Sequence, residues 1–391
     1  MSDEVELLVL GGGPAGLSAA RAYRAAGARG AVAIVTDEHR MPYNRPPLTK
    51  DFLRGESSED ELPIEDEDWL AEQGVRLVSG RAVALDHEAR TVALSGGREL
   101  RYSSCVLATG AEPTRLPVPG VDHPSVRVIR TLDHVRELTA RLRAGDPVVV
   151  IGSGFIGWEI AASLRRRGQD VTLVSDESEP NIARLDAEPA ERIHRWLDED
   201  GVQLHLGTEV EAISPTANGS LEVRAGAVRA VGRIVVMAAG VAPRGELAAA
   251  AGLELSDDGA VPVTTAMRTV REGLYAAGDV AFAENASAGR RLRVEHWGDA
   301  LGQGEVAGRN AAGEPAEWDA VPGFWSTIGD HTLKYAAWGD GFEQSRLEDH
   351  GNGSFTAWYG ADGKIVGVLA HEADEDYDRG RELIARGAPW S

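Results

Sequence analysis

The chain has 391 residues, 43% of them hydrophobic and 26% charged, which is typical of a globular protein with two or three domains rather than one small core. Its formal net charge of −22 disfavours non-specific binding to nucleic acid or to anionic membranes. No apolar stretch is long enough to span a bilayer, and a first strand beginning at Val5 leaves no room for a signal peptide, so we expect a cytoplasmic location.

Cys105 is the only cysteine. An internal disulfide is therefore impossible, and so is any relay of electrons through a cysteine pair within the chain. Because Cys105 begins the apolar run Cys105–Ala108, we predict a buried side chain that packs as a small hydrophobe. The alternative is a peroxide- or disulfide-reducing thiol, which would need exposure and a cationic neighbour.

A glycine fingerprint occurs twice, 141 residues apart. Each copy follows an apolar strand and precedes a helix rich in small residues, the arrangement that places a pyrophosphate on free backbone N–H groups. One copy alone is weak evidence, but two copies in this context predict two dinucleotides on one polypeptide. The copies are Gly11, Gly13 and Gly16 between Val5–Leu10 and Leu17–Ala26, and Gly152, Gly154 and Gly157 between Val148–Ile151 and Glu159–Arg167.

The next strand, Val32–Thr36, ends in Asp37 and Glu38. A carboxylate at that position can accept hydrogen bonds from ribose hydroxyls, although a solvated strand end would look the same. The loop Pro42–Lys50 follows, and its prolines should prevent a helix before Pro47. The acidic segment Ser57–Glu67 is expected on the surface.

The remaining pattern predicts an α/β fold. Its order favours two Rossmann-like dinucleotide-binding domains, the first interrupted by the second, plus a small α+β C-terminal domain. We predict the first domain at 1–113 and 240–319, the second at 114–239 and the third at 320–391. The expected strands are Val75–Leu77, Ala82–Leu85, Thr91–Leu94, Cys105–Ala108, Val171–Val174, Ile234–Ala238, Leu274–Ala277, Phe355–Tyr359 and Ile365–Leu369, and the helices are Trp69–Gln73, Leu132–Leu142, Gly298–Asn310 and Tyr377–Ala385.

The whole chain resembles the FAD-dependent NAD(P)H:ferredoxin reductases of oxygenase systems, of the putidaredoxin-reductase and biphenyl-dioxygenase-reductase type, and more distantly apoptosis-inducing factor. The resemblance implies FAD on the first fingerprint, NADH on the second, and single electrons passed to a ferredoxin-type [2Fe-2S] carrier, with no metal site in the chain itself. It is carried by the two fingerprints, Pro42–Lys50, Ala108–Gly110, Glu159, Gly278-Asp279, Glu295–Trp297 and Phe324–Ser326.

The resemblance also implies a FAD site. Gly11, Gly13, Pro14, Ala15 and Gly16 would wrap the pyrophosphate, and Asp37 or Glu38 would hold the adenosine ribose. Val83 would offer its backbone to adenine, unless it is a plain core valine, and Asp279 would bond the ribitol chain, unless it is a turn or cap residue. Trp325 would lie near the flavin, unless it is a core tryptophan. The other expected cofactor contacts are Arg45, Ala108, Thr109, Gly110, Arg130, Gly240, Glu295, His296 and Trp297.

Lys50 and Glu159 form the expected catalytic pair. Only three of the 40 basic side chains are lysines, and the resemblance implies that Lys50 lies beside flavin N5, held by Glu159. A cation there would favour electron gain by the flavin. The alternative is a surface salt bridge of little consequence. Trp158 is bulkier than expected beside this pair and is predicted to narrow the nicotinamide approach.

On the second fingerprint, the resemblance assigns Gly152, Gly154, Phe155, Ile156 and Gly157 to NAD(P)H. The strand Val171–Val174 runs into Asp176 and Glu177, whose charge would repel a 2′-phosphate, so we expect a preference for NADH over NADPH. Arg184 could reach a phosphate instead, and Ser175 stands where an acid is often found.

Other functions remain open at this stage. One alternative is an NADH oxidase or a quinone or dye reductase, and another is a redox-sensing, NADH-binding interaction protein. Ferredoxins are usually acidic, so an acidic chain would need a local basic patch to receive one. Arg290, Arg291 and Arg293 could form it, although a solvated loop is the simpler interpretation, and Thr327 replaces an acid often seen in relatives.

Overall fold

The computed structural model describes residues 3–390 and shows an α/β protein that divides into two compact units. Unit 1 contains the residues up to Asn44, Leu62–Glu112 and Ala242–Phe324; unit 2 contains Arg45–Glu61, Pro113–Val241 and the residues from Trp325 onward. The expected fold class is confirmed, including a first unit that is discontinuous in sequence. The assignment of three functional domains stays a prediction.

Unit 1 is built on a mixed sheet in the order β3-β2-β1-β6-β5-β4, with β18 beside β6. Strands β3, β2, β1, β6 and β18 are parallel, and β4 and β5 form an antiparallel extension. Leu7–Leu10 and Val32–Val35 are almost fully buried, as expected of parallel strands covered on both faces. The strands are β1 (Glu4–Leu10), β2 (Val32–Thr36), β3 (Val75–Ser79), β4 (Ala82–Asp86), β5 (Thr91–Leu94), β6 (Glu99–Leu107) and β18 (Leu274–Ala276).

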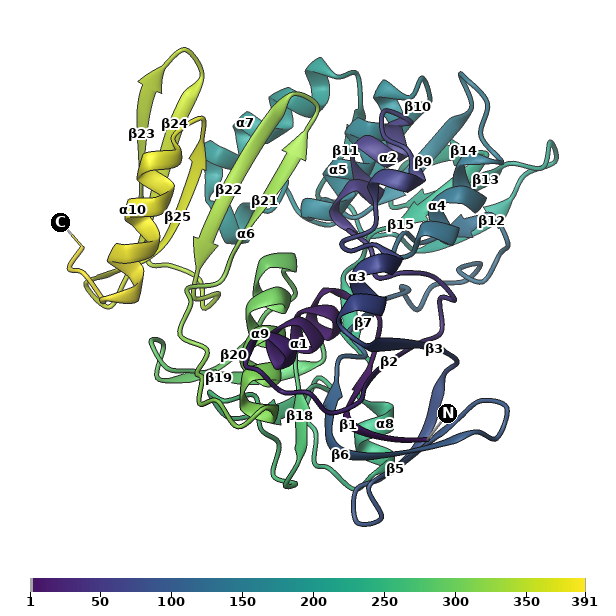
Figure 1. Ribbon diagram of the computed structural model, residues 1–391. Coiled ribbons are helices and arrows are strands. Elements are labelled where there is room, and N and C mark those ends of the chain that lie inside the picture. The colour runs from purple at the N-terminus through teal and green to yellow at the C-terminus, as the bar shows by residue number, and fades with distance from the viewer. Residues whose placement is uncertain (1–2, 391) are drawn as a thin grey trace. The chain divides into compact units, whose positions relative to one another are not determined.

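Two helices of unit 1, α1 (Pro14–Ala25) and α9 (Trp297–Ala311), lie side by side although they are far apart in sequence (Figure 1). A Cβ on Gly304 would lie 2.2 Å from the carbonyl oxygen of Ala15, and one on Gly308 would lie 2.1 Å from that of Ala19. Glycine at both positions therefore allows the close helix contact. The unit also holds α3 (Glu67–Glu72), α8 (Glu246–Ala250), β17 (Val261–Val263), β19 (Ala281–Asn285) and β20 (Arg290–Arg293).

Unit 2 contains a second parallel sheet in the order β11-β10-β9-β15-β8. Helix α5 (Phe155–Arg166) contacts β9 and β10, and a three-stranded antiparallel sheet packs nearby through a shared core around Val149 and Val223. The other elements are α4 (Leu132–Thr139), α6 (Ile182–Leu185), α7 (Ala187–Glu199), β8 (Val126–Arg127), β9 (Pro147–Ile151), β10 (Asp170–Val174), β11 (Gln203–His205), β12 (Ala212–Pro215), β13 (Leu221–Ala225), β14 (Val228–Gly232) and β15 (Ile234–Met237).

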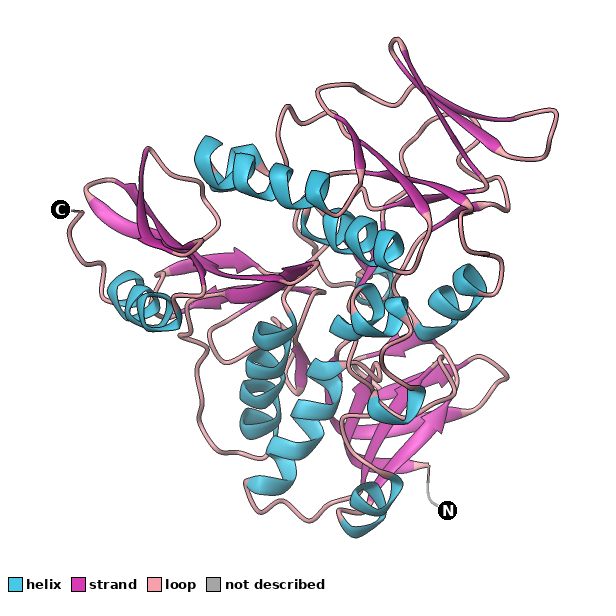
Figure 2. Cartoon of the chain, turned by 90° about the horizontal axis from the view of Figure 1, so that it is seen from above, coloured by secondary structure: helices cyan, strands magenta, loops and turns pink. Residues whose placement is uncertain are grey.

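The last part of the chain forms an antiparallel sheet in the order β21-β22-β25-β24-β23. Helix α10 (Asp374–Ala385) packs against β22 and β25, as Figure 2 shows near the C-terminus. The strands are β21 (Gly323–Ile328), β22 (His331–Ala337), β23 (Gln344–Gly351), β24 (Ser354–Ala361) and β25 (Lys364–His371). Two short strands, β7 (Ala111–Pro113) and β16 (Val241–Pro243), occur where the chain passes between the units.

Three local expectations need correction. A 3₁₀ helix (Pro46–Thr49) begins at Pro46, the second of the three loop prolines, and leads into α2 (Asp51–Arg54), because proline is tolerated in a first turn whose N–H groups lack helical partners. Helices α1 and α5 also begin earlier than predicted, directly after each glycine turn. Arg290–Arg293 form strand β20 rather than a loop. Within residues 3–390, no helix has both the length and the apolar character that crossing a membrane requires.

Candidate functional site

The first glycine turn joins β1 to α1 in unit 1. Gly11 has a φ of +130°, and a Cβ there would lie 2.0 Å from the carbonyl oxygen of Ala108 on the neighbouring strand. A Cβ on Gly16 would lie 2.1 Å from the carbonyl oxygen of Gly11. These two glycines therefore allow the sharp turn and the close packing of the helix on the strand.

Gly13 differs from its two neighbours in the fingerprint. It is the N-cap of α1, no side chain caps the helix, and a Cβ added to it would meet no protein atom within 4 Å. The first N–H groups of a helix have no helical partners, and they carry the positive end of its dipole. Bare N–H groups beside open space fit the pyrophosphate of a dinucleotide.

The second turn, between β9 and α5 in unit 2, repeats this geometry. Gly152 has a φ of +103° and faces the carbonyl oxygen of Ala238, and a Cβ on Gly157 would lie 2.0 Å from the carbonyl oxygen of Gly152. Gly154 is an N-cap without a capping side chain, and a Cβ there again meets nothing. Both fingerprints therefore form open turns with the geometry of an anion site, one in each unit.

The acids after the first turn's second strand have different surroundings. Asp37 is exposed, whereas the Glu38 carboxylate accepts a hydrogen bond of 2.5 Å from the Tyr43 hydroxyl. The backbone N–H of Glu38 donates to Thr36 Oγ1 at 3.3 Å. Glu38 is thus fixed beside the strand end, and Asp37 points to solvent.

In unit 2, the corresponding acid is Glu177, and its carboxylate is hydrogen-bonded to the glycine turn itself. Ser153 Oγ donates to Glu177 Oε2 at 2.7 Å and lies 2.8 Å from Ser175 Oγ, and the N–H of Asn181 also donates to Glu177. Asp176 is exposed. The Arg184 guanidinium carbon lies 5.7 Å from the centre of the Phe155 ring, so this cation is also near the turn.

Several other expected contacts of unit 1 gather around α1. Ala108 packs against Gly11, and a Cβ on Gly278 would lie 3.0 Å from the Cβ of Ala15, which brings the buried Asp279 close to the first turn. The Gly278 N–H donates to Gln303 of α9. Thr109 Oγ1 donates to the carbonyl oxygen of Arg244, and Gly110 accepts from the N–H of the same residue.

Glu295, His296 and Trp297 lead into α9, whose N-cap His296 makes no capping bond from its side chain. The His296 ring lies 4.6 Å from that of Phe324, and its Nδ1 is 3.2 Å from Asp299. Burial raises the pKa of Glu295, and the charge of Asp279 acts in the same direction, while Arg293 opposes both.

Lys50 and Glu159 form a buried ion pair within unit 2. Lys50 Nζ lies 2.8 Å from Glu159 Oε2, and the two residues are 8% and 2% exposed. The alternative of a surface salt bridge is therefore wrong. Thr49 Oγ1 donates to the same carboxylate oxygen at 2.6 Å, and Ser163 Oγ of α5 donates to the carbonyl oxygen of Thr49.

The other carboxylate oxygen of Glu159 is held from the C-terminal part of the chain. Ser326 Oγ on β21 donates to Glu159 Oε1 at 2.6 Å, and the indole N–H of Trp158 donates to Ser326 Oγ at 2.8 Å. Trp158 is fully buried, and the expectation that it narrows or reshapes the nicotinamide approach stays a prediction. Arg45 donates to the carbonyl oxygen of Arg130, which brings two more predicted cofactor residues together.

Comparison with known proteins agrees with this geometry. Residues 5–304 match the model of the pyridine nucleotide-disulphide oxidoreductase family. The chain belongs to this family. It is 34% identical to the ferredoxin--NAD(+) reductase component of the anthranilate 1,2-dioxygenase system of Burkholderia cepacia, over 97% of this chain and 94% of that one. It is 30% identical to rhodocoxin reductase of Rhodococcus erythropolis, over 98% and 90%.

Solved structures of related proteins share the whole fold of this oxidoreductase. The ferredoxin reductase of the CYP199A2 system of Rhodopseudomonas palustris matches with a TM-score of 0.93 and 31% identity, over 100% of this chain and 96% of that one. The reductase in the covalent putidaredoxin reductase–putidaredoxin complex matches with a TM-score of 0.92 and 26% identity, over 98% and 94%. The resemblance inferred from the sequence is thereby confirmed.

Although the family is named for disulphides, this oxidoreductase has a single cysteine. Cys105 is fully buried in β6, as predicted, and burial raises the pKa of its thiol far above the usual range. An exposed, reactive thiol is therefore excluded. Two further alternatives are also wrong, because Val83 is 55% exposed and Trp325 is 43% exposed, so neither is a core residue. Their contacts with a cofactor stay predictions.

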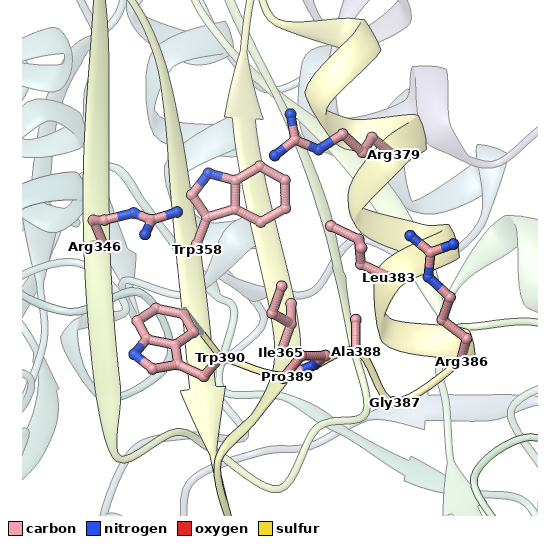
Figure 3. A pocket seen from close by; sticks show the side chains of 10 residues that line it. All are labelled: Arg346, Trp358, Ile365, Arg379, Leu383, Arg386, Gly387, Ala388, Pro389 and Trp390. Carbon is pink, nitrogen blue, oxygen red and sulfur yellow. The ribbon is translucent and has the colours of Figure 1, made fainter.

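The oxidoreductase has a separate pocket of about 500 Å³ between α10, the strands β23 to β25 and the last residues of the chain. Three arginines, Arg346, Arg379 and Arg386, line it together with the indoles of Trp358 and Trp390 (Figure 3). The Arg379 guanidinium carbon lies 5.2 Å from the Trp358 ring centre, and that of Arg346 lies 5.7 Å from Trp390. None of the site residues predicted from the sequence lines this pocket.

The residues that sequence reasoning missed are all small hydroxyl side chains. Thr49, Ser153, Ser163 and Ser326 hold the acids and the loop of the candidate site. Ser153 and Ser326 lie inside recognised motifs, but serine is common and its partners are distant in sequence. Thr49 could have been suspected from the sequence, because it directly precedes the predicted catalytic Lys50.

Proposed function

We propose that this chain is a FAD-dependent oxidoreductase that takes hydride from NADH and passes single electrons to a ferredoxin-type [2Fe-2S] protein, in the cytoplasm, where NADH is available. The observation that supports this most strongly is the presence of two open glycine turns in one polypeptide, each with an unobstructed middle glycine. The relatives named as ferredoxin--NAD(+) reductase and rhodocoxin reductase support the direction and the acceptor.

Bound FAD would supply the redox chemistry, because a flavin accepts a hydride and releases its electrons singly. The chain's own contribution is to hold and tune it. In unit 1, the N–H groups of Gly13, Ala15 and Gly16 would hold the pyrophosphate, and Asp37 or Glu38 would hold the ribose. Asp279, close to the same turn, would bond the ribitol chain.

Lys50 would place a positive charge beside the flavin. Its ammonium is buried and bonded to Glu159, which fixes its position. A preorganised cation stabilises negative charge that develops during reduction, and it does so without the cost of reorganising water. Glu159 is a positioning residue in this scheme, and Lys50 is the group that acts on the cofactor.

NADH would bind the turn at Gly152–Gly157 in unit 2. The Glu177 carboxylate, held by Ser153 at that turn, would accept hydrogen bonds from the ribose hydroxyls and repel a 2′-phosphate. Arg184 is near Phe155, but it is exposed and does not pair with Glu177 in the described contacts. We therefore assign the preference for NADH to Glu177.

The test begins with purified protein reconstituted with FAD. Anaerobic addition of NADH should bleach the flavin absorbance, and NADPH should do so less efficiently. Electrons should then reach cytochrome c through an added [2Fe-2S] ferredoxin much faster than they reach oxygen. Protein that neither retains nor takes up FAD would refute the proposal, and dominant oxygen consumption would favour the NADH oxidase alternative.

Lys50→Met offers the sharpest variant. It keeps the length of the side chain and removes its charge, so FAD binding should persist while flavin reduction by NADH slows by about tenfold or more. Arg167→Met is the control, because this cation bonds the carbonyl oxygen of Leu53 in the neighbouring helix α2 but not Glu159. Equal rates in both variants would remove Lys50 from the mechanism.

A further inference from the structure

We infer that Ser326 and Trp158 are positioning residues that orient the Lys50–Glu159 ion pair from the C-terminal part of the chain. The redox consequence of this inference rests on the proposed function. The hydrogen bonds and the ion pair from which it is argued all lie within unit 2.

The carboxylate of Glu159 has a donor on each oxygen. Oε2 accepts from Lys50 Nζ at 2.8 Å and from Thr49 Oγ1 at 2.6 Å, and Oε1 accepts from Ser326 Oγ at 2.6 Å. All four residues are buried, so water does not compete for these bonds. Removing one partner from buried hydrogen bonds of this kind costs stability, because the remaining polar group is left buried without a partner.

The direction of the hydrogen bonds follows from chemistry. An indole N–H can only donate, so Trp158 Nε1 must donate to Ser326 Oγ. The serine hydroxyl has one proton, and that proton is then directed to Glu159 Oε1. Trp158 thus fixes the hydroxyl of Ser326, and Ser326 fixes one oxygen of the carboxylate.

Three separate segments meet at this carboxylate. Thr49 and Lys50 come from the end of the 3₁₀ helix Pro46–Thr49 and the residue after it, Trp158 and Glu159 from α5, and Ser326 from β21. Among the described contacts, the Lys50 ammonium has one other hydrogen bond, a long one of 3.4 Å to the carbonyl oxygen of Pro46. Its ammonium position therefore depends mainly on Glu159, and the orientation of Glu159 depends on Ser326.

Removal of the Ser326 hydroxyl should release this arrangement. Oε1 would lose its donor and the Trp158 N–H its acceptor, so the carboxylate could rotate and take the ammonium with it. If the cation acts on the flavin, reduction by NADH becomes less favourable and slower. A merely structural serine would change stability but would leave the flavin's redox equilibrium untouched.

The experiment compares Ser326→Ala with the FAD-loaded wild-type chain. We expect the equilibrium of flavin reduction by NADH, measured anaerobically at several NADH/NAD⁺ ratios, to shift about tenfold against reduction, the size expected from the loss of one hydrogen bond to a charged group. That shift corresponds to about 30 mV for a two-electron couple. Ser326→Thr retains the hydroxyl and should restore most of it.

Thr327→Ala is the matched control. It removes a hydroxyl from the next position of β21, where Thr327 contacts Thr332 rather than Glu159. Trp158→Phe is a second variant, which removes the N–H that fixes Ser326 together with part of the buried indole ring, and it should shift the equilibrium in the same direction by less. It keeps the test decisive if Ser326→Ala does not fold.

The outcomes separate the two proposals. If Ser326→Ala and Trp158→Phe behave like Thr327→Ala while Lys50→Met is impaired, the positioning role is wrong and the proposed function stands. If the wild-type flavin is not reduced by NADH, the proposed function fails first. A shift in Ser326→Ala that Ser326→Thr rescues would support the inference.

Discussion

The two glycine turns have the same backbone and different side chains. Strand register aligns them, because Leu10 pairs with Val35 in unit 1 and Ile151 pairs with Val174 in unit 2. Gly12 then corresponds to Ser153, and Glu38 corresponds to Glu177. In both units the N–H of the glutamate donates to a hydroxyl two residues earlier, at 3.3 Å and 3.2 Å.

The two turns differ in the hydrogen-bond partner of each glutamate carboxylate. A Cβ on Gly12 would lie 2.9 Å from that of Thr36, so the first turn has no room for a side chain there, and Glu38 bonds Tyr43 instead. Ser153 fits in the second turn and holds Glu177 beside the glycines. The shared backbone can hold a pyrophosphate, and one residue beside it decides how the rest of the nucleotide is recognised.

The largest expected effect comes from closing the first turn with Gly13→Val. A Cβ at this position meets no protein atom within 4 Å, so folding should cost only about 1 kcal/mol, as for a poorer N-cap. The new side chain would occupy the space for the pyrophosphate, and the purified protein should be colourless and inactive. The flavin-to-protein absorbance ratio measures this, and a full complement of FAD in the variant would contradict it.

Gly154→Val closes the second turn in the same way and should have a different result. The protein should keep its FAD and its colour, while the KM for NADH rises about tenfold or more because the pyrophosphate contacts are lost. Steady-state kinetics at fixed acceptor concentration measure this. Loss of FAD from this variant would mean that the assignment of the two turns is reversed.

Glu177→Gln tests the side-chain difference. Without the negative charge, a 2′-phosphate is no longer repelled, and the ratio of kcat/KM for NADPH to that for NADH should rise about tenfold. Glu38→Gln is the matched control, since its carboxylate bonds Tyr43 in the other unit, and it should leave this ratio within about twofold. Equal changes in both variants would break the comparison.

The smallest expected effect is a loss of folding stability at acidic pH. Burial and the charge of His371 lower the pKa of His331 in unit 2, so its contribution to stability is present above the ordinary histidine pKa and is lost as the pH falls. Glu295 in unit 1, with its raised pKa, contributes most at low pH and loses that contribution as the pH rises. Acid should therefore weaken the protein through His331.

Urea unfolding at pH 7.5 and 5.5 would measure this loss. His331→Phe keeps an aromatic ring on Trp196, against which His331 stacks at 4.2 Å, and removes the titration. The variant should lose less stability between the two pH values than the wild type. An identical loss would place the acid sensitivity elsewhere.

Local patterns predicted the repeated framework well. The apolar runs before each fingerprint form parallel strands. Gly11 and Gly152 begin the turns, because a Cβ at either position would clash with the carbonyl oxygen of Ala108 or Ala238. The pairing of Lys50 with Glu159 came from resemblance to a family and is confirmed as a contact, whereas its burial could not be read from residues 109 positions apart.

What the sequence determined by itself was the α/β fold, the two dinucleotide turns and the absence of a disulfide, because these depend on short-range spacing and residue type. The tertiary structure alone decided which hydroxyls hold the acids. Ser326 reaches Glu159 across 167 positions, and Trp158 points inward to it rather than outward. Hydrogen bonds between distant segments have no local pattern, since the packing of whole strands and helices selects the partners.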